Sequence, residues 1–99
     1  VFGGSHYAAA KAAVLGYTKA AARELGSDHI RVNAVCPGFV DTDITDGLLA
    51  PERMASIVKT SVPLGRAGTV QDISQAVEYL LDATYVTGAN IDVAGGYRL

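Results

Sequence analysis

The residues with the clearest capacity for chemistry are a tyrosine and a lysine four positions apart, Tyr7 and Lys11. Side chains four positions apart lie on one face of an α-helix, so the phenol and the ammonium would point the same way. A free phenol has a pKa of about 10 and is a poor acid or base at neutral pH. Because a nearby cation favours the phenolate, we expect Lys11 to lower the pKa of Tyr7 towards the range that suits acid–base catalysis.

The pair by itself is a weak signal, since most Tyr-x-x-x-Lys pairs are ordinary surface neighbours. Its significance depends on the secondary-structure element in which the pair lies. Residues 7–25 are helix formers, and Gly26 is expected to take the left-handed position that ends the helix. Small apolar residues cover almost every side of this segment. The predicted helix should therefore be buried on more than one side, against a sheet and against a partner subunit.

A β-rich run, residues 30–36, follows the helix, and its apolar content is typical of a strand covered on both faces of a parallel sheet. Pro37 and Gly38 should end the strand. Ligands of open parallel sheets bind in the crevice at the carboxyl ends of the strands. The segment from Pro37 to Thr42 is expected at that crevice.

The rest of the chain reads as two helices and a strand. Pro51 should lie in the first turn of a short helix that ends near Ser61. Residues 69–82 should form a helix that begins with a capping box. Its expected core residues are Ile73, Ala76, Val77, Leu80 and Leu81. Residues 90–93 should form the last strand. Arg66 is expected to make a structural ion pair or a carbonyl contact, in preference to a substrate contact.

Several motifs occur together, in a fixed order. They are Tyr7-x-x-x-Lys11, Arg31-Val32-Asn33-Ala34-Val35, Pro37-Gly38 with Thr42, Pro63-Leu64-Gly65-Arg66, Val86-Thr87-Gly88 and Gly95-Gly96. This arrangement resembles the C-terminal part of a classical short-chain dehydrogenase/reductase over nearly the whole chain. The resemblance implies an α/β fold, namely the C-terminal part of a Rossmann-type doubly wound parallel sheet without its N-terminal cofactor-binding half.

The resemblance also implies an activity, which is hydride transfer between NAD or NADP and a carbonyl or secondary alcohol. Tyr7 would be the general acid/base, and Lys11 would lower its pKa and hold the ribose hydroxyls of the nicotinamide. The implied cofactor-binding residues are Tyr7, Lys11, Pro37, Gly38, Val40 and Thr42. Residues 43–62 would form a lid over the substrate, and the enzyme would be a homodimer or homotetramer that uses the helix of residues 7–25 as catalytic and interface helix.

The motifs are most similar to those of 3-oxoacyl-carrier-protein reductases. Those enzymes often carry a basic residue just after the first helix to dock an acidic carrier protein, whereas this chain has Asp28 in the turn. Because a carboxylate would repel such a partner, alcohol, sugar, polyol and steroid dehydrogenases stay open as alternatives.

Composition excludes several other classes. The 99 residues carry 8 basic and 10 acidic side chains and 49% hydrophobic residues, with no basic stripe for nucleic acid and no apolar run long enough to span a bilayer. A cytoplasmic protein is expected. Cys36 is the only cysteine and should be buried. The loop from Asp41 to Glu52 has calcium-loop spacing, but Asp46 stands where the motif requires glycine, so no metal site is predicted.

A glycine-rich dinucleotide loop, the family's catalytic Ser and an Asn of its proton relay would all lie before Val1. The sequence therefore reads as part of a chain more than twice as long. One alternative is an inactive fragment that acts only as an oligomerisation surface, and we expect the 99 residues alone to show no nicotinamide binding in a titration. Another is an extended-type sugar-nucleotide epimerase, which fits the Pro-Gly and Gly-Gly spacing poorly.

Overall fold

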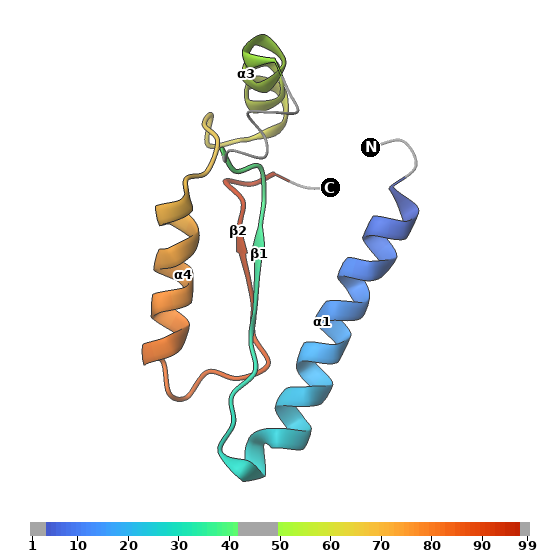
Figure 1. The fold of residues 1–99 in the computed structure, drawn as a ribbon, viewed down its shortest axis with the longest axis vertical. Helices are drawn as coiled ribbons and strands as arrows, with labels where there is room; N and C mark the ends of the chain where they lie inside the picture. Colours follow the sequence, from blue (N-terminus) through green and yellow to red (C-terminus); the bar gives the residue numbers. More distant parts are fainter. Residues whose placement is uncertain (1–3, 42–49, 98–99) are drawn as a thin grey trace.

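The computed structural model of the chain describes residues 4–41 and 50–97. Their elements, in order, are α1 (Ser5–Leu25), the 3₁₀ turn η1 (Gly26–Asp28), β1 (Ala34–Pro37), α3 (Pro51–Ser61), α4 (Val70–Asp82) and β2 (Asn90–Val93). The two strands pair in parallel, with Cys36 opposite Asp92. Helix α1 lies on one face of this small sheet and α4 on the other (Figure 1). The described part is thus a three-layer α/β unit, in agreement with the predicted fold class.

The core is small and, apart from Val62 at the end of α3, lies where α1 and α4 meet the sheet. Its buried apolar residues are Ala21, Ala22, Cys36, Val62 and Leu80. Burial of Cys36 is as predicted. Helix α1 approaches the strands near its C-terminal end and diverges from them towards its N-terminal end (Figure 1). Its buried residues accordingly belong to the last two turns.

The outer side of α1 is not covered by any described residue. Val14 is 57% exposed and Tyr17 is 73% exposed. The expectation of burial on a second side is therefore not met within residues 4–41 and 50–97. A helix with large apolar residues on its free side is typical of an interface helix, so the predicted subunit contact stays a prediction.

The end of α1 differs from its prediction. Gly26 has right-handed helical angles, with φ of −59°, and His29 is the left-handed residue, with φ of 61°. The His29 N–H donates to the Gly26 carbonyl at 3.0 Å, and the Ile30 N–H donates to the Leu25 carbonyl at 3.2 Å. These two bonds form a Schellman motif. The prediction for Gly26 is wrong because the helix first tightens into η1, which delays the reversal by three residues.

The strand predicted over residues 30–36 is shorter at its start and is hydrogen-bonded only from Ala34 to Pro37. Val32 and Asn33 bond the loop before β2 instead of a strand. The Asn33 amide donates to the Val86 carbonyl at 3.0 Å and accepts from the Ala89 N–H at 2.9 Å. Side-chain bonds of this kind take the place of a sheet ladder.

Arg31 joins the sheet layer to the end of α4. Its guanidinium donates to the Leu80 carbonyl at 2.6 Å, to the Ala83 carbonyl at 3.1 Å and to the Leu81 carbonyl at 3.2 Å. The last carbonyls of a helix lack partners within the helix, and a cation there also interacts favourably with the negative end of the helix dipole. Arg31 therefore fixes the C-terminal end of α4 against the strands.

The start of α4 carries the predicted capping box. The Asp72 N–H donates to Thr69 Oγ1 at 3.1 Å, and the Thr69 N–H donates to Asp72 Oδ2 at 2.8 Å. Arg66 donates to both carboxylate oxygens of Asp72, at 2.7 and 3.3 Å, so the structural ion pair predicted for Arg66 is confirmed.

The predicted core of α4 is only partly correct. Leu80 is buried and Ile73 and Ala76 are half-buried, but Val77 is 42% exposed and Leu81 is 68% exposed. The prediction is wrong for these last two because a two-stranded sheet is narrow and covers only one stripe of the helix.

The capping box makes a pH-dependent contribution to stability. The guanidinium of Arg66, followed by the hydrogen bond from Thr69, holds the pKa of Asp72 well below its usual range. Stabilisation from a lowered carboxyl pKa is complete above about pH 4 and is lost as the pH falls through the folded-state value. Asp72→Asn in the complete protein should lower the melting temperature at pH 7, with a difference from wild type that shrinks below about pH 4.

Thermal unfolding of both proteins between pH 2 and pH 7 measures this difference. Asp82→Asn at the other end of α4 is the control, because Asp82 has no ion pair among the described residues. A gap between wild type and Asp72→Asn that stays constant down to pH 2 would contradict the assignment.

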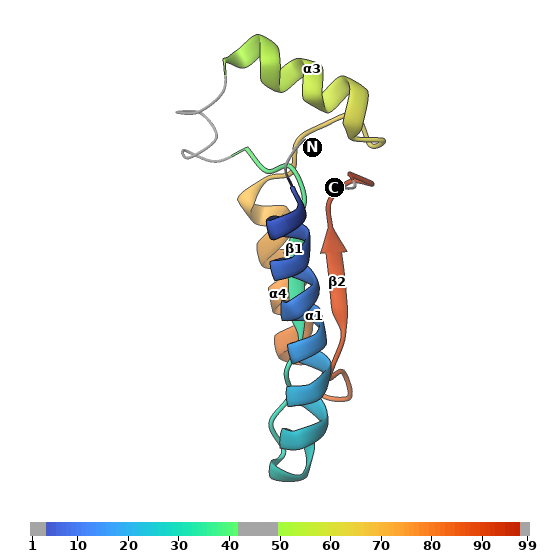
Figure 2. The same cartoon turned by 90° about the vertical axis from the view of Figure 1, so that its right-hand side faces the viewer.

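Helix α3 begins with Pro51 at its first turn, as predicted, and Met54, Ile57 and Val58 are half-buried on one side. It crosses above the carboxyl ends of both strands (Figure 2). The lid of residues 43–62 stays a prediction, and its residues 43–49 lie outside the described part. Of the helices that the structure describes, none has the length and apolar content needed to cross a membrane.

Candidate active site

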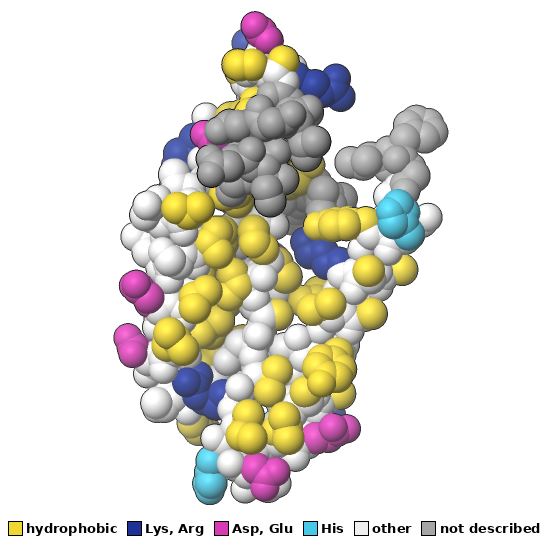
Figure 3. Space-filling model, in the orientation of Figure 1, with side chains coloured by type: hydrophobic (Ala, Val, Ile, Leu, Met, Phe, Trp, Pro, Cys, Tyr) yellow, Lys and Arg dark blue, Asp and Glu magenta, His cyan; other side chains and the backbone are white. Residues whose placement is uncertain are grey.

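The main candidate site is a cleft of about 890 Å³ between α1 and the sheet. Figure 3 shows a hollow there, bordered by hydrophobic side chains of both layers. Four of the predicted site residues line it, namely Tyr7 and Lys11 from α1, and Pro37 and Gly38 from the end of β1. The cleft thus lies at the carboxyl ends of the strands, where parallel sheets bind ligands.

Tyr7 and Lys11 line this cleft together with Ala8, Ala12 and Leu15 of the same helix. These positions recur at three- and four-residue spacing and form one helix face. Both polar side chains therefore face the same space, as their spacing predicts. Tyr7 is 52% exposed and Lys11 is half-buried, so the phenol is accessible from the cleft.

Of the two remaining cofactor-binding predictions, the structure places only Val40. Val40 does not line this cleft; it lines an adjoining apolar cavity of about 660 Å³ beside α4, which it shares with Pro37 and Gly38. Val40 also pairs with Gly68 in an isolated parallel bridge. Thr42 lies outside the described residues.

The floor of the cleft contains polar side chains that the sequence did not assign to a site. Cys36, Asn90 and Asp92 all line it, and the Cys36 thiol donates to Asn90 Oδ1 at 2.8 Å. Asn90 and Asp92 alternate with Ile91 and Val93 along β2, so they lie on one face of the strand. That alternation was a usable signal, because it shows that one side of the last strand is polar.

A turn of four residues, Ala94–Tyr97, closes the end of the cleft, and we call it the C-terminal turn. Ala94 and Tyr97 both line the cleft. The rings of Tyr97 and Phe39 are 6.3 Å apart with an interplanar angle of 50°, a tilted aromatic contact. Tyr97 is therefore a further aromatic wall of the site that the sequence did not identify.

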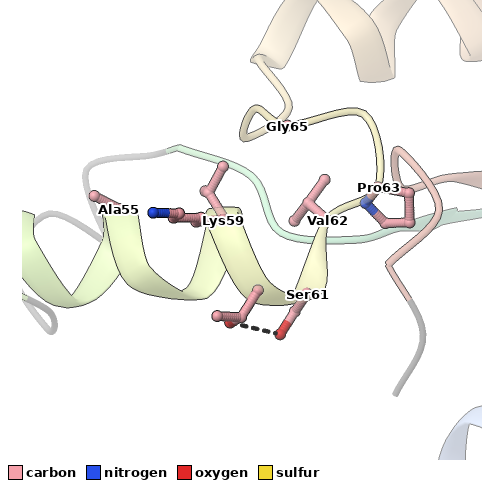
Figure 4. A pocket seen from close by; sticks show the side chains of 8 residues that line it. Ala55, Lys59, Ser61, Val62, Pro63 and Gly65 are labelled. Carbon is pink, nitrogen blue, oxygen red and sulfur yellow. Dashed lines mark hydrogen bonds between the residues drawn. The ribbon is translucent and has the colours of Figure 1, made fainter.

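Another cavity, of about 550 Å³, lies at the C-terminal end of α3 (Figure 4). Its lining includes Lys59, Ser61 and Val62, and Thr60 and Ser61 share a hydrogen bond at 3.4 Å. It contains neither the tyrosine nor any carboxylate. Acid–base chemistry is therefore better supported in the cleft beside α1. Among residues 4–41 and 50–97, no three His, Cys, Asp or Glu side chains are grouped so as to hold a metal ion.

Comparison with known proteins gives consistent matches. A family model described as enoyl-(acyl carrier protein) reductase matches residues 1–98. A short-chain type dehydrogenase/reductase of Sinorhizobium fredii is 53% identical over 98 residues, which are 97% of this chain and 38% of that protein. The 3-oxoacyl-[acyl-carrier-protein] reductase FabG of Pseudomonas aeruginosa is 49% identical over 96 residues, 95% of this chain and 38% of that protein.

Among solved structures, a 4-hydroxyisoleucine dehydrogenase mutant complexed with NADH and succinate superimposes with a TM-score of 0.82 and 37% identity. The match covers 91% of this chain and 38% of that one. The chain thus spans a little over a third of the length of these relatives. The matched family model, the order of the motifs and the shared fold lead to one conclusion: the chain belongs to the short-chain dehydrogenase/reductase family.

Proposed function

We propose that the complete protein is a NAD(P)-dependent oxidoreductase that transfers a hydride between a nicotinamide and a carbonyl or secondary alcohol carbon. The observation that carries this proposal is the convergence of Tyr7, Lys11, Pro37 and Gly38 on one cleft at the carboxyl ends of the strands. Family membership supports it, because the related proteins are named as reductases and dehydrogenases.

Tyr7 is the proton donor to the oxygen of a carbonyl substrate and the acceptor in the reverse direction. A phenol needs help to lose its proton at neutral pH. Lys11, on the same cleft wall, supplies a positive charge that stabilises the phenolate. Ala8, Ala12 and Leu15 give the pair apolar neighbours on the same wall of the cleft.

The cleft suits a nicotinamide and its ribose. Its volume of about 890 Å³ lies in the range of ordinary ligand sites. The ammonium of Lys11 is the donor for the ribose hydroxyls, while Pro37 and Gly38 line the ring. Val40, in the adjoining cavity, and Thr42 serve its carboxamide and phosphate side. A bound NAD or NADP would supply or accept the hydride.

For the substrate, we propose a 3-oxoacyl thioester, on the basis of the FabG relative. A sugar or other secondary alcohol is the competing class, supported by Asp28 in the turn after α1. Helix α3 covers the substrate from above the strand ends. A second copy of the chain packs on the exposed side of α1, around Val14 and Tyr17, to give a homodimer or homotetramer.

The test mixes the complete protein with NADH or NADPH and a 3-oxoacyl thioester, in parallel with NAD or NADP and a panel of secondary alcohols. We expect cofactor oxidation in the first set at a rate that depends on both reactants. Turnover only with alcohols would support the proposed oxidoreductase activity but would make a secondary alcohol, and not a 3-oxoacyl thioester, the substrate. Absence of cofactor binding and of all turnover would overturn the proposal and favour the reading of the chain as an oligomerisation surface.

A further inference from the structure

The C-terminal turn, Ala94–Tyr97, lies directly behind the segment that leaves α3. We call that segment, Val62–Gly65, the lid base. Gly95 and Gly96 have φ angles of +59° and +90°, which residues with a side chain rarely adopt. The Leu64 N–H donates to the Gly95 carbonyl at 3.0 Å. The lid base is therefore held by backbone atoms of the turn.

The packing between these two segments leaves no space for a side chain on either glycine. A Cβ on Gly96 would lie 2.7 Å from Pro63 Cγ and 3.0 Å from Pro63 Cβ and Cδ. A Cβ on Gly95 would lie 3.0 Å from Val62 Cγ1. Val62 is only 4% exposed, so it cannot move aside without losing its burial. The contact is thus a close and specific one.

The same turn contacts the cleft on its other side. Ala94 packs against Gly38, and Tyr97 packs against Phe39 and lines the cleft that contains Tyr7. One four-residue turn therefore touches both the base of α3 and the site of the proposed chemistry. Because closely packed segments have few alternative arrangements, a shift of this turn should also shift the segments in contact with it.

We propose that the C-terminal turn positions α3 over the cleft, and that the contact between Gly96 and Pro63 sets the affinity for the substrate. This inference rests on the proposed function, in which α3 covers the substrate. Gly96 is a positioning residue, since it acts through Pro63 and not on the reacting atoms. Misplacing a substrate-covering helix weakens binding more than it slows the proton step.

The decisive variant is Gly96→Ala in the complete protein. The added methyl must displace Pro63, and we expect KM for the carbonyl substrate to rise about tenfold. Both kcat and the dissociation constant of the cofactor should stay within about twofold. Pro63→Ala in the same background deletes the crowding Cγ and Cδ atoms and should restore most of the lost affinity.

Gly65→Ala is a matched control. Gly65 also has a positive φ, +77°, and belongs to the lid base, but a Cβ there would meet no atom within 4 Å. It therefore carries the backbone strain without the clash, and its KM should stay near that of wild type. Equal KM increases in Gly65→Ala and Gly96→Ala would overturn the proposal, as would an unchanged KM in Gly96→Ala.

A readout that needs no turnover separates this inference from the proposed function. Amide hydrogen exchange at Leu64 should be faster in Gly96→Ala than in wild type or Gly65→Ala, because its bond to Gly95 is weakened. An unchanged exchange rate would overturn the proposed link between the C-terminal turn and the lid base, even in an active enzyme. Faster exchange in a protein without reductase activity would keep the coupling and reject the proposed function. Should Gly96→Ala fail to fold, Pro63→Ala alone loosens the same contact and is expected to raise both exchange and KM.

Discussion

Replacing Tyr7 by Phe in the complete protein is expected to lower kcat by about 10³-fold, because positioned acid–base catalysis is worth about 10² to 10⁴. The substitution removes only the hydroxyl, and the ring keeps its place on the wall of the cleft. The cofactor dissociation constant should therefore change by less than about twofold. Steady-state kinetics in both reaction directions, with a cofactor titration, measure the two quantities.

Tyr17→Phe is the matched control for this variant. Tyr17 belongs to the same helix and is 73% exposed, but it does not line the cleft. Its turnover should match that of wild type. Near-normal turnover in Tyr7→Phe would remove Tyr7 from the mechanism, while equal losses in both variants would point to damage of α1 and not to a lost proton donor.

The second large effect is expected for Gly38→Ala. A Cβ on Gly38 would lie 2.6 Å from Ala94 Cβ, 2.7 Å from Ala94 Cα and 3.1 Å from the Ala94 carbonyl oxygen. Two of these atoms belong to the backbone, so the ends of β1 and β2 must move apart. We expect the free energy of unfolding to fall by about 3 kcal/mol. Each 1.4 kcal/mol of distortion energy at Pro37 and Gly38 would also weaken cofactor binding about tenfold.

Two further variants sharpen this prediction. Gly68→Ala is the control, since a Cβ there would meet its nearest neighbours at 3.5 Å or more, in ordinary contact. Ala94→Gly combined with Gly38→Ala should recover only part of the loss, because it removes the Cβ contact and leaves the two backbone contacts. Denaturant unfolding and cofactor titration provide the measurements. A stable Gly38→Ala variant with normal cofactor affinity would show that the end of β1 does not need the close approach of Gly38 to Ala94.

Interactions within a few residues along the chain account for what could be predicted well. The capping box of Thr69 and Asp72, the first turn at Pro51 and the shared face of Tyr7 and Lys11 all arise between positions at most four apart. Such contacts depend on local geometry and residue type alone. The order of the motifs was also readable, because it is a property of the sequence itself.

The predictions that failed depend on partners distant along the chain. The predicted start of β1 was wrong because Val32 and Asn33 bond the loop before β2, more than 50 positions away. Val77 and Leu81 were expected in the core, yet their burial depends on how much sheet lies beneath α4. The left-handed residue was expected at Gly26 and not at His29, because a helix can end in several backbone conformations that all give its last carbonyls hydrogen-bond donors.

The sequence by itself determined the elements, the family motifs and the two polar side chains of the helix, since each follows from local spacing. Only the tertiary structure decided that Asn90, Asp92 and Tyr97 complete the cleft and that the C-terminal turn supports both the cleft and α3. Those relations join β2 and the turn after it to α1, β1 and the lid base. The physical reason is that parallel pairing and close backbone packing bring distant residues together, and no local pattern encodes those distances.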